Sequence, residues 1–164
     1  MKRAGVVMVR PRTPADDRAI AAIARPSFGR YSHAPEQSIA AMIGAASART
    51  LVAEASGKVV GFAIVTFEAL SRPFGPWARP VVASLDAIAV SESAQGNGVG
   101  KALLAEVERV AREEQSVSLT LRTATTNRRA QALFRGAGFQ TTVELHAFYR
   151  AGQTALAMTK LLAS

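Results

Sequence analysis

The chain has 164 residues, 49% of them hydrophobic, and a formal net charge of +8. This length and apolar content suit one domain over 1–164, and the charge indicates either an arginine-rich solvated surface or an attraction for phosphorylated cofactors, nucleic acid or acidic partners. The absence of cysteine excludes disulfides, thiol nucleophiles and thiolate metal sites, and the two histidines, His33 and His146, lie too far apart in sequence to suggest a metal centre. Because there is no apolar run of about 18 residues and no convincing signal peptide, we expect a cytoplasmic protein without a membrane span.

The N-terminal segment predicts one strand and one helix. A β-rich run indicates a strand over 5–10. Ile20 and Ile23 have the spacing of one buried face, which predicts a helix over 15–24. Pro26 should end this helix, because proline has no N–H to donate and its ring clashes with the preceding turn.

A loop, a second helix and a hairpin follow. We expect the loop over 27–35 and the helix over 36–46. Two β-rich runs, 51–55 and 59–67, are separated by a short turn that contains glycine, which is typical of a hairpin. Three prolines between positions 71 and 80 then predict a surface loop.

The most informative stretch joins a strand, a glycine-rich turn and a helix. An apolar run predicts a buried strand over 81–90, and a helical pattern covers 102–111. Between them, three glycines stand at alternate positions, namely Gly96, Gly98 and Gly100. The apolar face of the helix consists of Val99, Leu103, Val107 and Val110.

The glycine-rich turn has the features of an anion site. A helix N-terminus offers unpaired backbone N–H groups and a positive dipole end, and glycines let a ligand approach them. The P-loop pattern fails because position 95 is Gln and position 102 is Ala, and the dinucleotide fingerprint fails because its third glycine comes one residue early. What remains is Gln95-x-x-Gly98-x-Gly100, for which a plain glycine-rich turn is the alternative interpretation.

The C-terminal third alternates strands and one helix. A strand is expected over 116–122, and a helix over 127–136 with Gly138 just beyond its end. Two long strands, 139–149 and 153–162, complete the chain with a turn between them.

A second motif lies on the helix over 127–136. It reads Asn127-x-x-Ala130-x-x-Leu133-Phe134-x-x-x-Gly138-Phe139. In this order and spacing, the two motifs closely resemble those of the GNAT (Gcn5-related) N-acetyltransferase superfamily, whose first motif binds the acetyl-CoA pyrophosphate. The expected order of strands and helices is similar to that of the superfamily over almost the whole chain.

The resemblance implies a fold and a co-substrate. The fold would be a mixed, strongly twisted, mostly antiparallel sheet of six to seven strands, flanked by about four helices and splayed open after the central strand. Acetyl-CoA would place its pantetheine arm in that opening and its pyrophosphate on the glycine-rich turn, without a metal. The implied cofactor-binding residues are Ile88, Ala89, Val90, Gln95, Gly96, Asn97, Gly98, Val99, Gly100, Lys101, Asn127, Ala130 and Phe134.

The resemblance also implies catalytic roles, with one departure. The amide of Ile88 would stabilise the charge that develops on the thioester oxygen. The superfamily's usual tyrosine, which commonly protonates the departing CoA thiolate, is Phe134 here. Because a thiol has a pKa of about 8.5, the thiolate is a tolerable leaving group without that acid. Tyr149, on the strand expected after the helix, is the candidate replacement.

The general base is expected to be a carboxylate or histidine that acts through water. We choose Asp86, because strict strand alternation places it on the same side as Ile88 and Val90; the alternative is that it pairs with an arginine. The other candidates are Glu68, Glu144 and, with a strand-surface position more expected, His146.

The sequence therefore predicts an enzyme that moves an acetyl group from acetyl-CoA to a primary amine of a small molecule, amino acid or peptide. A non-catalytic acyl-CoA-binding regulatory module is a second hypothesis, favoured by Phe134. A third is an RNA-directed protein such as an acetyltransferase of charged tRNA, suggested by the charge but not by any aromatic-basic RNA motif. A homodimer is left open.

Three segments are expected to form the acceptor pocket: the loops 27–35 and 71–80 and the turn 149–152. Phe74 and Trp77 of the second loop either shape the mouth or seal the edge of the core. Because these segments hold arginines and few acids, an amine that carries a carboxylate or phosphate fits better than a polycation.

Overall fold

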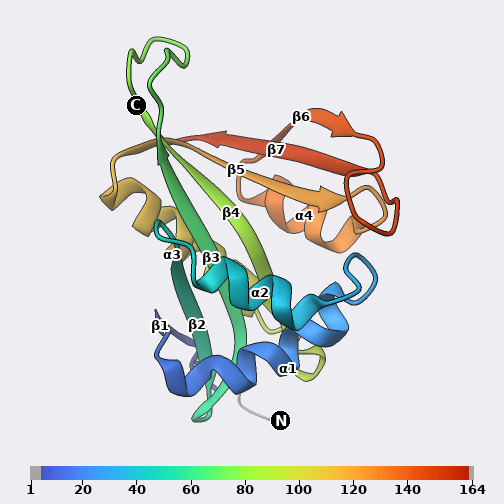
Figure 1. Cartoon of the computed structure of the whole chain (residues 1–164). Coiled ribbons are helices and arrows are strands. Elements are labelled where there is room, and N and C mark those ends of the chain that lie inside the picture. Colours follow the sequence, from blue (N-terminus) through green and yellow to red (C-terminus); the bar gives the residue numbers. More distant parts are fainter. Residues whose placement is uncertain (1–4, 163–164) are drawn as a thin grey trace.

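The computed structural model describes residues 5–162 and contains one seven-stranded sheet with helices on both faces (Figure 1). The strands are β1 Met8–Pro11, β2 Arg49–Ala55, β3 Lys58–Ala69, β4 Val81–Val90, β5 Ser116–Ala124, β6 Gln140–Leu145 and β7 Ala155–Leu161. The helices are α1 Asp17–Phe28, α2 Pro35–Ile43, α3 Val99–Glu113 and α4 Arg128–Gly136, with short 3-10 turns at Pro14–Asp16 and Glu92–Ala94.

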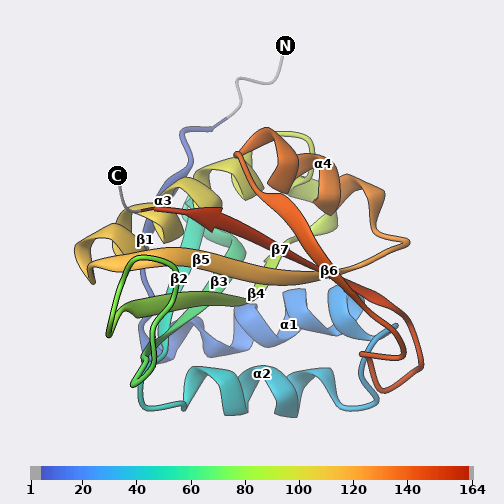
Figure 2. The ribbon, with the colours of Figure 1, turned by 90° about the horizontal axis from the view of Figure 1, so that it is seen from above.

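The sheet has the strand order β1-β2-β3-β4-β5-β7-β6 and is antiparallel except for the β4–β5 pair. Seen from above, α1 and α2 lie on one side of the sheet and α3 and α4 on the other (Figure 2). The expected mixed, mostly antiparallel sheet with four flanking helices is therefore confirmed.

Two apolar clusters lie on the two faces of the sheet. The four α3 positions expected to face the core, Val99, Leu103, Val107 and Val110, are all buried in the larger cluster. Ile20 and Ile23 of α1 are buried against Phe62 of β3 in the second cluster. In both helices, the apolar positions predicted from the helical periodicity are therefore the ones that pack against the sheet.

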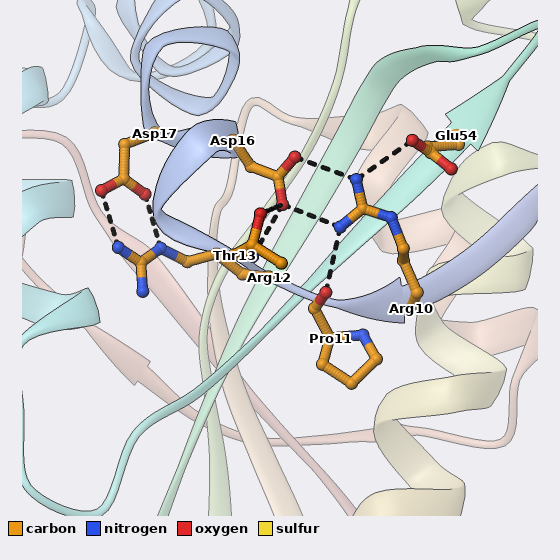
Figure 3. Close-up of polar contacts among 7 residues, drawn as sticks. All are labelled: Arg10, Pro11, Arg12, Thr13, Asp16, Asp17 and Glu54. Atoms are coloured by element: carbon orange, nitrogen blue, oxygen red, sulfur yellow. Dashed lines mark hydrogen bonds and ion pairs between the residues drawn. The ribbon is translucent and has the colours of Figure 1, made fainter.

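A partly buried ion pair joins β1 to the start of α1 (Figure 3). The Arg10 guanidinium donates to both carboxylate oxygens of Asp16, at 2.8 and 2.9 Å, and to Glu54 of β2 at 3.0 Å. Asp16 also accepts from the Thr13 amide at 2.7 Å, which completes the cap of the turn. These donors, Arg10 first, hold the pKa of Asp16 well below its usual range.

The structure corrects the expected N-terminal boundaries. The first strand begins at Met8 rather than Gly5, and α1 passes through Pro26 to Phe28. The proline sits in the last turn, where Ser27 Oγ donates to the Ile23 carbonyl at 2.9 Å and Phe28 packs on Phe62 with ring centroids 6.3 Å apart. Tertiary packing of this turn offsets the helix-breaking effect of the proline.

The C-terminal strands are shorter than expected. β6 ends at Leu145 and β7 begins at Ala155, so Tyr149 and His146 lie in the connecting loop and not on a strand. The Tyr149 amide bonds to the Gln153 carbonyl at 3.2 Å, which closes a compact turn within the loop. The expected helix over 127–136 is correct within one residue, and Gly138 follows it with a φ of 95°.

The sheet opens between the two parallel strands, β4 and β5. The register of β4 and β5 ends at Leu85 and Leu121, although β4 continues to Val90 and β5 to Ala124. Figure 1 shows the two strands diverging beyond this point. The backbone edges of both strands face the opening there, so a ligand can bond to them as a further strand would.

No helix within residues 5–162 has both the length and the apolar content to span a bilayer.

Candidate active site

The site begins at a bulge in β4, beside the opening. Ala87 pairs with Ile64 and Leu85 pairs with Val65, so Asp86 has no partner residue on β3. Its carboxylate accepts from Thr66 Oγ1 and from Ser84 Oγ, both at 2.8 Å. Such a bulge adds one residue to the strand and so reverses the alternation of side chains beyond it.

This bulge corrects the expected orientation of Asp86. Ile88 and Val90 pack with the larger apolar cluster, on the α3 face of the sheet, whereas Ala87 and Ala89 pack with the second cluster, on the α1 face. Asp86, bonded to Ser84, lies on the face opposite Ile88 and Val90, toward α1 and α2. Strict alternation was therefore the wrong rule for this strand, because it assumes an unbroken ladder.

The glycine-rich turn presents a row of free backbone donors. Gly98 is the N-cap of α3 with a φ of 79°, a left-handed conformation that glycine adopts without strain. Within residues 5–162, no backbone hydrogen bond uses the N–H groups of 96–101 as donors. A Cβ at Gly98 would meet nothing within 4 Å, so this turn leaves space beside its amides. These are the properties of an anion-binding helix N-terminus.

Arg129 of α4 extends to this turn, although it is not among the residues predicted from the sequence. Its Nη1 donates to Gln95 Oε1 at 3.0 Å, and Gln95 Nε2 donates to the Val90 carbonyl at 3.2 Å. The first turn of α4 holds Arg128 and Arg129 and no acid. Cations there oppose the helix dipole, and this unfavourable placement was the available signal for an anion nearby.

One cleft of about 800 Å³ passes through the opened sheet and unites these features. All the predicted cofactor residues except Asn97 line it, and so do the predicted catalytic residues Asp86, Ile88 and Tyr149. The Asn97 side chain instead donates to the Ala94 carbonyl at 3.2 Å and braces the turn. The volume of the cleft is that of a typical ligand site.

The side of the cleft near α1 and α2 is bounded by aromatic side chains from two loops. Tyr31, from the loop between α1 and α2, contacts Tyr149 of the β6–β7 loop with ring centroids 4.8 Å apart. Gln153 Nε2 donates to the Arg30 carbonyl at 2.7 Å and joins the same loops.

The third expected segment, 71–80, does not reach the cleft. It projects from the far ends of β3 and β4, at the top of Figure 1, and Phe74 and Trp77 stack on each other. The prediction that this loop helps to form the acceptor pocket is wrong. The loop precedes the first residue of β4, whereas the sheet opens beyond Leu85, in the second half of that strand.

The two residues expected to matter for thiolate departure differ in environment. Phe134 is buried and packs edge-on against Phe139, with centroids 6.0 Å apart. Desolvation, together with the neighbouring Tyr31, raises the pKa of Tyr149 to about 12, and Arg122 opposes the shift. Tyr149 therefore keeps its proton at neutral pH.

Asn127 caps α4, since its Oδ1 accepts from the Ala130 amide at 3.2 Å. Asn127→Ala should lower the free energy of unfolding by about 1 kcal/mol through loss of this cap. Asn127→Ser keeps a capping oxygen but removes the side-chain amide that lines the cleft. If that amide binds the co-substrate, the Ser variant will be stable in denaturant unfolding, but its acetyl-CoA affinity, measured by calorimetry, will be as weak as that of the Ala variant. Equal affinity in the wild type and the Ser variant would assign Asn127 to capping alone.

Comparison with known proteins agrees with this geometry. The model of the Acetyltransferase (GNAT) family matches residues 17–139, which include the glycine-rich turn and α4. The chain belongs to the GNAT family. As a GNAT protein it is an acetyltransferase. No curated protein matched the sequence.

Solved GNAT structures superpose over nearly the whole chain. Ribosomal-protein-alanine N-acetyltransferase from Brucella melitensis is 26% identical, with a TM-score of 0.74 and coverage of 94% of this chain and 99% of that one. A GCN5-related N-acetyltransferase from Kribbella flavida is also 26% identical, with a TM-score of 0.76 and coverage of 95% and 98%. Arabidopsis thaliana NAA60 in complex with acetyl-CoA shares the fold at 18% identity, with a TM-score of 0.80 and coverage of 96% and 99%.

Proposed function

We propose that this GNAT protein transfers the acetyl group of acetyl-CoA to a primary amine of a small molecule, amino acid or peptide. The observation that supports it is the continuous cleft, which joins the free amides of the glycine-rich turn to a chamber on the opposite face of the sheet. The bulged Asp86 lies at the opening, on the face of the sheet that bears this chamber. A cofactor and an acceptor can thus meet at the opening from opposite sides.

The residues present fit acetyl-CoA. The amides of 96–101 and the guanidinium of Arg129 offer donors and positive charge for a pyrophosphate. The open edge of β4 beyond Leu85 offers backbone partners for the amide groups of pantetheine. Ala130 and Phe134 of α4 supply an apolar wall on the other side.

In the proposed reaction the acceptor nitrogen forms a bond to the thioester carbonyl carbon, and the carbon–sulfur bond breaks. An ammonium acceptor loses two protons in total, one before attack and one after, and the departing thiolate regains one. Asp86, directly or through water, would receive the proton that frees the amine. The amide of Ile88 would donate to the carbonyl oxygen as negative charge grows on it.

Tyr149 would assist the leaving thiolate by donating a hydrogen bond. Full proton transfer from a phenol whose pKa is raised to about 12 to a thiolate whose conjugate acid has a pKa of about 8.5 is unfavourable. The tyrosine would therefore stabilise the thiolate without surrendering its proton, and water would supply the proton that CoA retains.

Phe134→Tyr tests whether a second hydroxyl helps. The ring is kept, and the new group would lie on the cleft wall, so we expect a rise in kcat of roughly tenfold or less, because the thiolate already leaves readily. Tyr149→Phe should lower kcat in the wild-type background, and it should lower kcat by a smaller factor when it is combined with Phe134→Tyr. Steady-state kinetics at saturating acceptor would measure both, and full activity in Tyr149→Phe would remove its assigned role.

A screen of amines, amino acids and peptides with acetyl-CoA, read out by CoA thiol release and mass spectrometry of the product, tests the proposal itself. Acetylation of one class supports it. Acetyl-CoA binding without thiol release on any acceptor would favour the regulatory module, and release only with charged tRNA would favour the RNA-directed enzyme.

A further inference from the structure

Two opposite charges flank the opening on its acceptor face. Ser84 of β4 pairs with Thr120 of β5, so these side chains share the face toward α1 and α2. Arg122 lies two residues beyond Thr120 and returns to that face, and the bulge returns Asp86 to the face of Ser84. Both residues line the cleft, and no ion pair joins them.

The Arg122 guanidinium is held in place but has no anionic partner. It lies over the Phe148 ring, 5.4 Å from the centroid, in the loop that also places Tyr149. Among residues 5–162 it makes no ion pair and no side-chain hydrogen bond, so its donors are free to face a ligand. Stacking on an aromatic ring orients a guanidinium for planar recognition of a carboxylate.

The Asp86 carboxylate is fixed and still has acceptor capacity. Each oxygen takes one hydroxyl donor, from Thr66 or Ser84, and keeps a lone pair for a further donor. An ammonium group placed at this carboxylate would stand beside the bulge, at the edge where β4 opens. The acceptor face therefore offers an anion for an amine and, across the gap, a cation for an acid.

We propose that the acceptor is a free α-amino acid, or another small amine that carries a carboxylate, with its ammonium at Asp86 and its carboxylate at Arg122. This proposal rests on the N-acetyltransferase function proposed above and names its substrate class. The product would be an N-acetylamino acid, formed with CoA and one released proton, and Arg122 would bind the carboxylate without entering the chemistry.

The rim of the cleft favours a small acceptor over a peptide. Tyr31 and Tyr149 contact each other at the cleft, and the Gln153 bond to the Arg30 carbonyl joins the same two loops. A peptide must continue past its first residue, and its first carbonyl is a neutral amide that leaves Arg122 without a charged partner. The free acid is small enough to lie beside the Tyr31–Tyr149 contact, and its carboxylate gives Arg122 a charged partner.

The experiment compares free L-amino acids with the matching amino-acid amides. In the wild type we expect kcat/KM to favour the free acids by about 10–100-fold, the worth of a charge-assisted bidentate contact. Arg122→Gln should remove this preference, mainly by raising KM for the acids, and should change kcat/KM for the amides much less. Arg135→Gln makes the same change of charge on the exposed face of α4, away from the cleft, and should keep wild-type values.

Acetyl-CoA affinity, measured by calorimetry on each variant, separates the two proposals. Equal rates on acids and amides, a preference for peptides, or an Arg122→Gln loss that is the same for both classes would overturn the amino-acid assignment and leave the acetyltransferase function standing. Acetyl-CoA binding with no turnover of any amine would overturn both.

Discussion

Replacing Gly98 by Asp is expected to abolish the stabilisation that acetyl-CoA gives the wild-type protein. The side chain would grow from the N-cap of α3 into the space beside the free amides of 96–101 and would place a negative charge there. That charge repels a pyrophosphate and occupies the positive end of the helix dipole itself.

The expected size of the loss follows from linkage. At an acetyl-CoA concentration of about 100 times Kd, binding adds about 2.7 kcal/mol to the stability of the folded state. In a chain of this length that raises Tm by roughly 5–11 °C, which differential scanning fluorimetry resolves easily. Gly98→Asp should show no shift.

Gly98→Asn is the matched control, because Asn has the same shape as Asp and tolerates the same left-handed conformation. Both variants should lose similar intrinsic stability, about 1–2 kcal/mol. The Asn variant should keep part of the acetyl-CoA shift. A full shift in Gly98→Asp would exclude the glycine-rich turn as the pyrophosphate site.

Asp86→Asn is expected to lower kcat by about 10²-fold or more, because the amine would lose the group that accepts its proton. The amide can keep hydrogen bonds to Thr66 and Ser84, whose hydroxyl groups rotate, so the bulge should persist. Acetyl-CoA affinity should therefore stay at its wild-type value, and the loss should appear in kcat at saturating acceptor.

Glu68→Gln is the control for Asp86→Asn. Glu68 lies on β3 opposite Val82, well before the opening, and does not line the cleft. It was an alternative base in the sequence argument, and we expect its removal to leave kcat within about twofold of wild type. If Glu68→Gln loses the activity and Asp86→Asn keeps it, the base is assigned to the wrong carboxylate.

The parts of this protein that the sequence revealed are those in which neighbours along the chain are neighbours in space. The face of α3 that Leu103 and Val107 mark, the glycine-rich turn before it and the start of α4 near Asn127 each depend on a few consecutive residues. Their motifs, in order and spacing, identified the family and with it the order of strands and helices.

Other features depended on residues that the chain brings together from a distance. The bulge at Asp86 exists only in the ladder with β3, and it reversed the facing of that side chain. The persistence of α1 beyond Pro26 depends on Phe62 of a later strand. Periodicity has no access to such contacts, because it assumes regular geometry within one element.

The sequence by itself determined the fold, the acetyltransferase family and the position of the candidate phosphate turn. Only the tertiary structure decided which charges line the cleft: Arg129 of α4 donates to Gln95 in the turn before α3, and Arg122 of β5 lies across the opened sheet from Asp86 of β4. The reason is physical. Backbone hydrogen bonds and helix faces are local and repeat along the chain, whereas a binding site is made where strands stop pairing, and that point is set by the register of the whole sheet.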